Sequence, residues 1–211
     1  MFRRFLPAFL AVLIALPVAA QAPAGWRMRV DASTDVSDPD DVPEVRVTSV
    51  ANGIEVHTGP AVTLWNPANN ATGNYTLEGN FTLLAPSGHV NYYGLVYGGR
   101  NLDSSPSYIY FLVAQNGSFT IRHHANIGTV HDIVGRTPNA AVVQPGANGQ
   151  SVNRLQVRVG ASETQFLVNG TVVHTAPRSD MTGNTDGIWG FRVNHVIPGV
   201  RVEGLRVTTG E

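Results

Sequence analysis

The chain has 211 residues, of which 43% are hydrophobic and only 14% are charged. This composition provides enough apolar side chains for a packed core and excludes a highly charged, disordered tail. All 14 basic residues are arginine, which excludes Schiff-base chemistry, lysine general bases and P-loops. There is no cysteine, so disulfides, thiolate metal sites and lipid attachment through an N-terminal cysteine are excluded as well.

Residues 1–20 have the pattern of a cleavable signal peptide. Arg3 and Arg4 form a positive start, and residues 5–18 form an apolar stretch that is short for a bilayer span. Small residues end this segment, so we expect cleavage after Ala20, with a cut after Ala22 as the alternative. The mature chain then carries a net charge of −3 with neutral histidines, which does not favour binding to nucleic acid. No later stretch of the sequence predicts a membrane helix. These features predict a secreted or periplasmic protein.

Three Asn-Gly pairs are the strongest local signal in the mature chain. Asn-Gly favours the positive φ angles of a type I′ turn, whose twist matches the flanking strands of a hairpin. The pairs at 52–53, 116–117 and 169–170 each separate two β-rich runs. They predict three hairpins, which join residues 45–50 to 54–58, 108–115 to 118–122, and 163–168 to 171–175.

Alternation of apolar and polar residues predicts further strands. One face of the segment 75–83 carries Tyr75, Leu77, Gly79, Phe81 and Leu83, and its other face is polar. The segment 155–159 alternates in the same way. Residues 200–207 form the last predicted strand. A bulge at Gly204 would restore the alternation of inward and outward side chains along it.

Two segments, 92–97 and 108–113, are apolar on both faces, so we expect these strands to be covered on both sides or to line a recess. Residues 135–150 are the predicted long loop. About a dozen short strands exceed an immunoglobulin domain and fit an antiparallel, two-sheet jelly-roll sandwich. We therefore expect an all-β jelly-roll domain over residues 44–211, preceded by an N-terminal segment, 21–43, that contains an acidic loop.

The sequence resembles the concanavalin A-like lectin/glucanase superfamily, and within it the laminin-G-like and 3-keto-disaccharide hydrolase-like branches. Four stretches carry the resemblance: 75–81 (YTLEGNF), 91–98 (NYYGLVYG), 154–159 with 166–170 (RLQVRV and FLVNG), and 187–192 with 200–207 (GIWGFR and VRVEGLRV). The resemblance covers most of residues 44–208 and implies a jelly roll of two curved sheets. It leaves the function open, because this fold hosts lectins, hydrolases and adhesion modules.

Carboxylates give little support for a glycosidase. Enzymes of this superfamily carry Glu-x-Asp-x-x-Glu on one strand, and that pattern is missing here. Six acidic residues gather between Asp31 and Glu44, and the run 31–41 among them offers oxygen ligands in a flexible loop that are compatible with calcium, although it has no EF-hand spacing. The alternative is a solvated loop whose Asp and Ser side chains cap turns, and we expect no other cofactor.

Histidines offer a second candidate cluster, made of His123, His124, His131 and Asp132. His123 and His124 are adjacent, so in a strand they face opposite sides and only one can join a given site. A metal or acid/base site is one interpretation, and polar histidines on a strand face are the other.

Aromatic and polar side chains gather along two neighbouring predicted strands. Sugar recognition needs flat aromatic faces against ring C–H bonds together with amide and Arg donors for hydroxyls. The alternative is that the tyrosines fill the core between the sheets. The predicted ligand-binding set is His89, Asn91, Tyr93, Tyr97, Arg100, Tyr108 and Tyr110.

These observations favour a non-catalytic module that binds a carbohydrate or another extracellular polymer. A hydrolase or lyase acting on a glycoside, as the 3-keto-disaccharide hydrolase-like resemblance implies, is the second interpretation and would recruit His89, His131, Asp132 or Arg100. A protein-interaction domain is the third. If the chain is an enzyme, titratable groups with perturbed pKa values should converge in one pocket. A lectin should instead have an open groove, and a protein-binding module should have a flat apolar patch.

Overall fold

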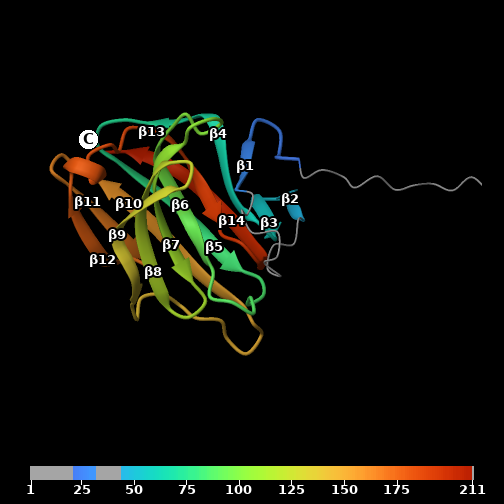
Figure 1. Ribbon diagram of the computed structural model, residues 1–211. Helices are drawn as coiled ribbons and strands as arrows, with labels where there is room; N and C mark the ends of the chain where they lie inside the picture. Colours follow the sequence, from blue (N-terminus) through green and yellow to red (C-terminus); the bar gives the residue numbers. More distant parts are fainter. Residues whose placement is uncertain (1–20, 32–43, 211) are drawn as a thin grey trace, which may run out of the picture.

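The computed structural model describes residues 21–31 and 44–210, which form two stacked antiparallel β-sheets (Figure 1). The predicted all-β, two-sheet sandwich is therefore confirmed. The predicted signal peptide and the acidic run after Asp31 lie outside the described residues. Within the described ranges the only helical element is a single 3-10 turn, Asp180–Thr182, and no helix there is long and apolar enough to cross a membrane.

Each sheet contains seven strands of the described residues, and strands from distant parts of the chain are neighbours in both sheets. Sheet A has the order β1 (Arg27–Asp31), β4 (Ala61–Ala71), β13 (Gly187–Val193), β6 (Tyr92–Arg100), β7 (Ser107–Ala114), β8 (Ser118–Asn126) and β9 (Thr129–Pro138). Sheet B has the order β12 (Thr171–Pro177), β11 (Glu163–Val168), β10 (Ser151–Val159), β5 (Tyr75–Leu83), β14 (Ile197–Thr209), β3 (Gly53–Thr58) and β2 (Val45–Val50).

Strand β1 corrects the expected start of the domain at residue 44. Residues 27–31 pair with β4 and form one edge of sheet A, so the sandwich already includes part of the segment 21–43. This strand was missed because it alternates Arg27, Arg29 and Asp31 with apolar residues over only five positions.

The core lies between the sheets and is filled by the inward rows of the central strands. Leu77, Phe81, Leu155 and Val157 are fully buried on sheet B, as their alternation predicts. Phe111 packs edge-on against Phe166 with ring centroids 5.4 Å apart, which ties the two sheets together at the centre.

The three Asn-Gly hairpins are confirmed, but only one of their turns has the expected conformation. Asn169 and Gly170 have φ angles of 52° and 85°, as a type I′ turn requires. At the second hairpin only Gly117 has a positive φ, 80°, and its N–H donates to the Ala114 carbonyl at 3.1 Å. Neither Asn52 nor Gly53 has a positive φ, because Gly53 is already the first residue of β3 and the loop is Ala51–Asn52.

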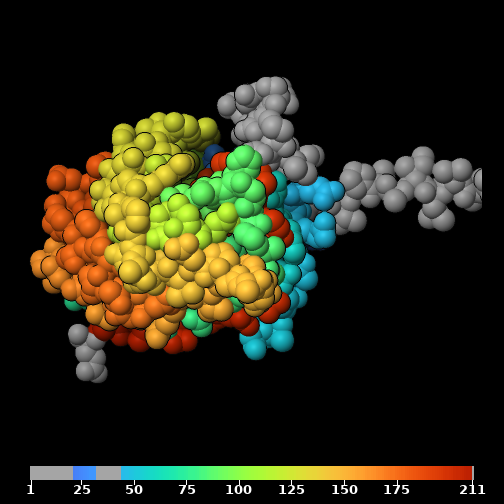
Figure 2. Space-filling view, turned by 90° about the horizontal axis from the view of Figure 1, so that it is seen from below, coloured from blue at the N-terminus to red at the C-terminus, as the bar shows by residue number. Residues whose placement is uncertain are grey.

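The predicted long loop is shorter than expected. Residues 135–138 belong to β9, and the loop proper covers 139–150. Figure 2 shows this loop in gold beside the bright green segment before β6, where together they close one end of the sandwich. Asn153 fixes the loop through two hydrogen bonds to the backbone of Val143, which are 2.8 and 3.0 Å long.

Glycine 190 marks a close approach within sheet A. The register of β13 with both β4 and β6 shifts between Ile188 and Gly190. A Cβ atom at residue 190 would lie 2.1 Å from the carbonyl oxygen of Leu64. Only a residue without a side chain lets the two backbones pair at this distance.

We predict that Gly190→Ala lowers the free energy of unfolding by about 1–3 kcal/mol, because the backbone of β4 must move to admit the methyl group. Gly135→Ala is the control, since nothing lies within 4 Å of a Cβ at that position. It should change stability by less than about 0.5 kcal/mol. Urea unfolding curves measure both variants, and equal stability of the two would contradict the close approach.

Candidate functional site

The outer face of sheet A carries a second row of large side chains. Residues alternate along β6 and β7, so that Tyr93 and Phe111 enter the core while Tyr92, Tyr108 and Tyr110 face the other way. The outward cluster is Trp65, Tyr92, Val96, Leu102, Tyr108, Tyr110, Leu112 and Ala114, and each member is at most 6% exposed. The expectation that these two strands are covered on both sides is therefore confirmed.

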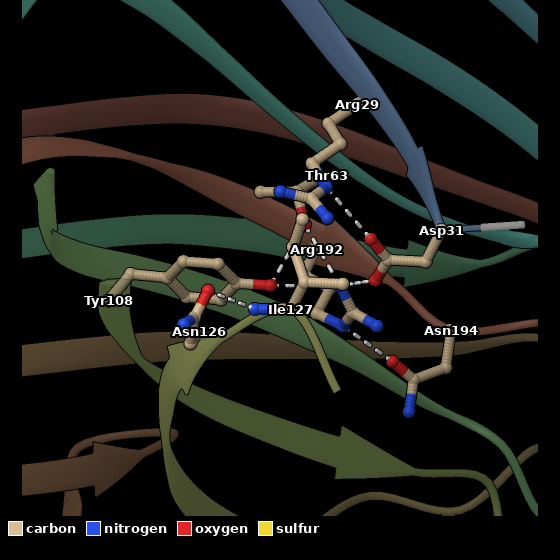
Figure 3. Close-up of polar contacts among 8 residues, drawn as sticks. All are labelled: Arg29, Asp31, Thr63, Tyr108, Asn126, Ile127, Arg192 and Asn194. Carbon is tan, nitrogen blue, oxygen red and sulfur yellow. Dashed lines mark hydrogen bonds and ion pairs between the residues drawn. The ribbon is translucent and has the colours of Figure 1, made fainter. Parts of the chain in front are cut away.

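Arg192, on β13, is the polar centre of this face, and Figure 3 shows side chains from β1, β4 and β7, together with Asn194 just after β13, converging on its guanidinium. Its Nη1 lies 2.6 Å from Oδ2 of Asp31 and donates to the hydroxyls of Thr63 and Tyr108, both at 3.0 Å. Its Nε donates to Oδ1 of Asn194 at 2.9 Å. We refer to these five residues as the Arg192 cluster.

Guanidinium groups also lie over two of the outward rings. The Cζ atom of Arg192 is 5.7 Å from the centroid of Tyr110, and that of Arg136 is 5.6 Å from the centroid of Tyr92. These distances are typical of cation–π contacts. Arg122 lies on the same face, with its Nε 2.5 Å from Oδ1 of Asp132. A layer of arginine side chains therefore covers the aromatic row.

His124 belongs to the same face. Its ring stacks on Tyr108 with centroids 4.8 Å apart and planes 6° from parallel. Burial, together with the positive charge of Arg192, lowers the pKa of His124 to about 4. The ring is therefore neutral at neutral pH, with one donor and one acceptor nitrogen.

Two buried polar atoms on this face have neither a hydrogen-bond partner nor an ion-pair contact among the described residues, whereas the buried Nε of Arg122 is held by Asp132. They are Nε2 of His124 and Nη1 of Arg29. Arg29 also donates from Nε to Asp31 Oδ1 at 3.2 Å, so it belongs beside the Arg192 cluster. A buried polar atom that lacks a partner costs free energy, so an added hydrogen-bond partner for either atom would be favourable.

Of the seven predicted site residues, Tyr108 and Tyr110 are brought together on the outer face of sheet A. Tyr93 and Tyr97 lie instead in the core between the sheets, 1% and 0% exposed, next to Phe81 and Phe166. Both rings lie in the layer between the two sheets, which a ligand on the outer face of sheet A cannot reach, so these two residues are not part of the candidate site. Strands that are apolar on both faces do not reveal which of two adjacent tyrosines points outward.

The remaining three predicted residues lie at the two ends of β6. His89 is exposed in the segment before β6, and Arg100 is exposed at the other end of that strand. Asn91 is buried just before β6, with an Nδ2 group that has no partner among the described residues. None of the three belongs to the Arg192 cluster.

Histidines 123 and 124 face opposite sides, as expected from their adjacency. His123 lies near His131 on the other side of the strand, with ring centroids 6.2 Å apart. Within the described residues no group of three or more His, Cys, Asp or Glu side chains could hold a metal ion. Of the acidic run that suggested calcium, Asp31 is described, and its carboxylate is engaged by Arg29 and Arg192.

Several site residues were missed because they are isolated in the sequence. Arg192 lies in β13 and Asn194 follows directly after it, while Thr63 and Asp31 come from two other strands. The polar residue at position 192 between Phe191 and Val193 is the one available signal, since a charged residue flanked by two core residues must face outward.

Comparisons with known proteins support the fold. No protein-family model matches the sequence, and no curated protein matches it. Among solved structures, the chain is similar to a carbohydrate-binding module, CBM66, from Bacillus subtilis, with a TM-score of 0.61 at 11% identity over 88% of this chain and 96% of that chain. It is also similar to a protein of unknown function with a galectin-like fold from Bacillus subtilis, with a TM-score of 0.54 at 11% identity over 88% of this chain and 90% of that one. The sandwich therefore has the galectin-like, concanavalin A-like fold.

We predict that Asp31→Ala lowers the free energy of unfolding by about 1.5–3 kcal/mol, because it leaves the buried guanidinium of Arg192 without its charged partner. Asp103→Ala is the matched control. Asp103 pairs with Arg27 at 2.6 Å, but both side chains are more than half exposed. That loss should cost at most about 1 kcal/mol. Equal destabilisation in chemical denaturation would show that Asp31 has no special role.

Stability should also depend on pH through His124. Its folded pKa, about 4, is below the ordinary value of 6.5, so the unfolded chain binds the proton more readily. The free energy of unfolding should therefore fall as the pH is lowered from about 6.5 to 4. His124→Gln should flatten this dependence, while the lowered pKa values of His123 and His174 preserve part of it. Parallel pH curves for the variant and the wild type would contradict this assignment.

Proposed function

We propose that the chain is an exported, secreted or periplasmic, non-catalytic module that binds carbohydrate through the outer face of sheet A. The observation that supports this most directly is the pair of buried, unpartnered polar atoms, His124 Nε2 and Arg29 Nη1, beside the Arg192 cluster. Neither atom has its hydrogen bond among the described residues, and saccharide hydroxyls can both donate and accept.

The chemistry of the surrounding side chains supports the same choice. Carbohydrate sites combine apolar ring surface with a few planar polar groups that fix the orientation of the ligand. Here the guanidinium and amide groups of Arg122, Arg192 and Asn194 lie over or beside Tyr108 and Tyr110, whose buried rings form the packed layer beneath them. Similarity to the CBM66 module is consistent with the proposal, although at 11% identity it bears on the fold alone.

Arg122 is the residue of this face that best suits a mutational test. Its side chain is 28% exposed and its partner Asp132 is 55% exposed, so removing this ion pair should cost little stability. A hydrogen bond from a guanidinium to a ligand contributes about 1.5–3 kcal/mol, which corresponds to a tenfold or larger change in affinity.

We predict that Arg122→Ala weakens binding of a glycan at least tenfold without lowering the melting temperature appreciably. The glycan is found first with an array and a thermal-shift screen of the mature protein, with and without calcium. Arg158→Ala is the control, because Arg158 is exposed on the outer face of sheet B. Unchanged affinity of the Arg122 variant in calorimetric titration would count against this face.

A hydrolase or lyase acting on a glycoside is the second candidate function. It is favoured by the neutral His124, which stacks on Tyr108 beside a positively charged Arg192. A neutral imidazole can accept a proton from a bound substrate as a general base. The two candidates separate in the same experiment, since an enzyme releases product from the bound glycan and a binding module leaves it intact.

A further inference from the structure

A second hollow lies on the opposite side of the sandwich, on the outer face of sheet B. It has a volume of about 350 Å³ and is formed by the neighbouring strands β5, β10 and β14. Its lining is polar and comprises Glu78, Gly79, Asn80, Arg154, Gly204 and Arg206. None of these residues belongs to the Arg192 cluster.

Two guanidinium groups converge here on one carboxylate. Arg154 Nη2 lies 2.5 Å from Glu78 Oε2, and Arg206 Nη2 is paired with Oε1 of the same residue. Gln156 Nε2 also donates to Oε2 at 2.9 Å. Burial alone would raise the pKa of Glu78, but Arg154 and Arg206 outweigh it, so the pKa is lowered and the carboxylate stays ionised.

The charges in this hollow do not cancel. Glu78 supplies one negative charge and the two arginines supply two positive charges, which leaves a surplus of one. The Glu78 side chain is 9% exposed, whereas those of Arg154 and Arg206 are 50% and 62% exposed. The carboxylate therefore holds two accessible guanidiniums in place from below, and each guanidinium carries further N–H donors besides the one paired with Glu78.

The bulge at Gly204 opens the floor of the hollow. Gly204 has a φ of 61°, and the pairing of β14 with β5 shifts between Glu203 and Arg206. A Cβ atom at residue 204 would lie 3.8 Å from Asn80 Nδ2 and 3.9 Å from Arg206 Nη1. The glycine thus leaves a space bounded by an amide donor and a guanidinium donor. Bulges commonly re-aim side chains next to functional sites.

We propose that this hollow binds an acidic saccharide through its oxyanion, a carboxylate or a sulfate, which Arg154 and Arg206 hold while Asn80 donates to an adjacent oxygen. Two guanidiniums preorganised by a buried carboxylate are suited to an oxyanion, because their planar donors match its geometry and their position is already fixed. The inference goes beyond the carbohydrate contacts proposed for the outer face of sheet A.

The test compares three ligands by calorimetric titration of the mature protein at low salt. They are a trisaccharide of galacturonic acid, its methyl ester, and a sulfated trisaccharide. We expect binding of one or both anionic ligands at least tenfold tighter than that of the ester, and weaker binding as salt is added. Carboxylate and sulfate are thereby distinguished as the source of the oxyanion. Equal affinity for the ester would overturn the proposal.

Matched variants assign the site. Arg206→Gln should weaken anion binding at least tenfold, and it leaves Glu78 paired with Arg154 and Gln156, so the fold is retained. Arg158→Ala removes the same charge from the same face, but outside the hollow, and should leave affinity within about twofold. Equal losses in both variants would show only a general charge effect and would overturn the proposal. Arg122→Ala on sheet A should not affect this binding, so the two sites can fail separately.

Discussion

The centre of sheet A is apolar or aromatic on both faces, and the packing and the candidate site both follow from this constraint. The inward row of β6 and β7 fills the core, with Tyr97 and Phe111 fully buried. The outward row would expose an aromatic surface to water, which is unfavourable by about 25 cal/mol for each Å². Arginine side chains cover it instead, because a guanidinium packs on an aromatic ring while it keeps its donors available.

This cover also explains the electrostatics of the face. A buried guanidinium needs charged or polar partners, and Arg192 obtains them from strands far apart in the sequence, through Asp31, Thr63 and Tyr108. The same positive charge contributes, after burial itself, to keeping His124 neutral. The result is a surface on which hydrogen-bond donors and one neutral imidazole lie over a rigid aromatic floor. Such preorganised groups lose little conformational entropy when they bind a ligand.

The sequence predicted the architecture well because its signals are local. Alternation in 75–83 and the three Asn-Gly hairpins place strands correctly, and Gly204 marks a real bulge. Turn conformation was predicted less well, since the register of β3 rather than the preference of Asn-Gly sets the turn at residues 51–52. Strand β1 was missed because it is short and mixes charged with apolar residues.

The candidate site was predicted only in part, for a different reason. Tyr108 and Tyr110 lie on the outer face, whereas Tyr93 and Tyr97 lie in the core, as the alternative interpretation of these tyrosines expects; alternation does not say which face of a strand is turned outward. The Arg192 cluster joins single residues from β1, β4, β7 and β13, and no spacing in the sequence reports that proximity.

The most direct test of the account is to map a bound saccharide on the protein by NMR. With a glycan that carries no acidic group and binds the mature protein, the largest shift changes should fall on backbone amides of β4, β7, β8 and β13, and the Nε2 resonance of His124 should move as it gains a hydrogen bond. If the changes are confined to sheet B or to the loops at the ends of the sandwich, and the His124 resonance stays in place, the outer face of sheet A is not the binding surface.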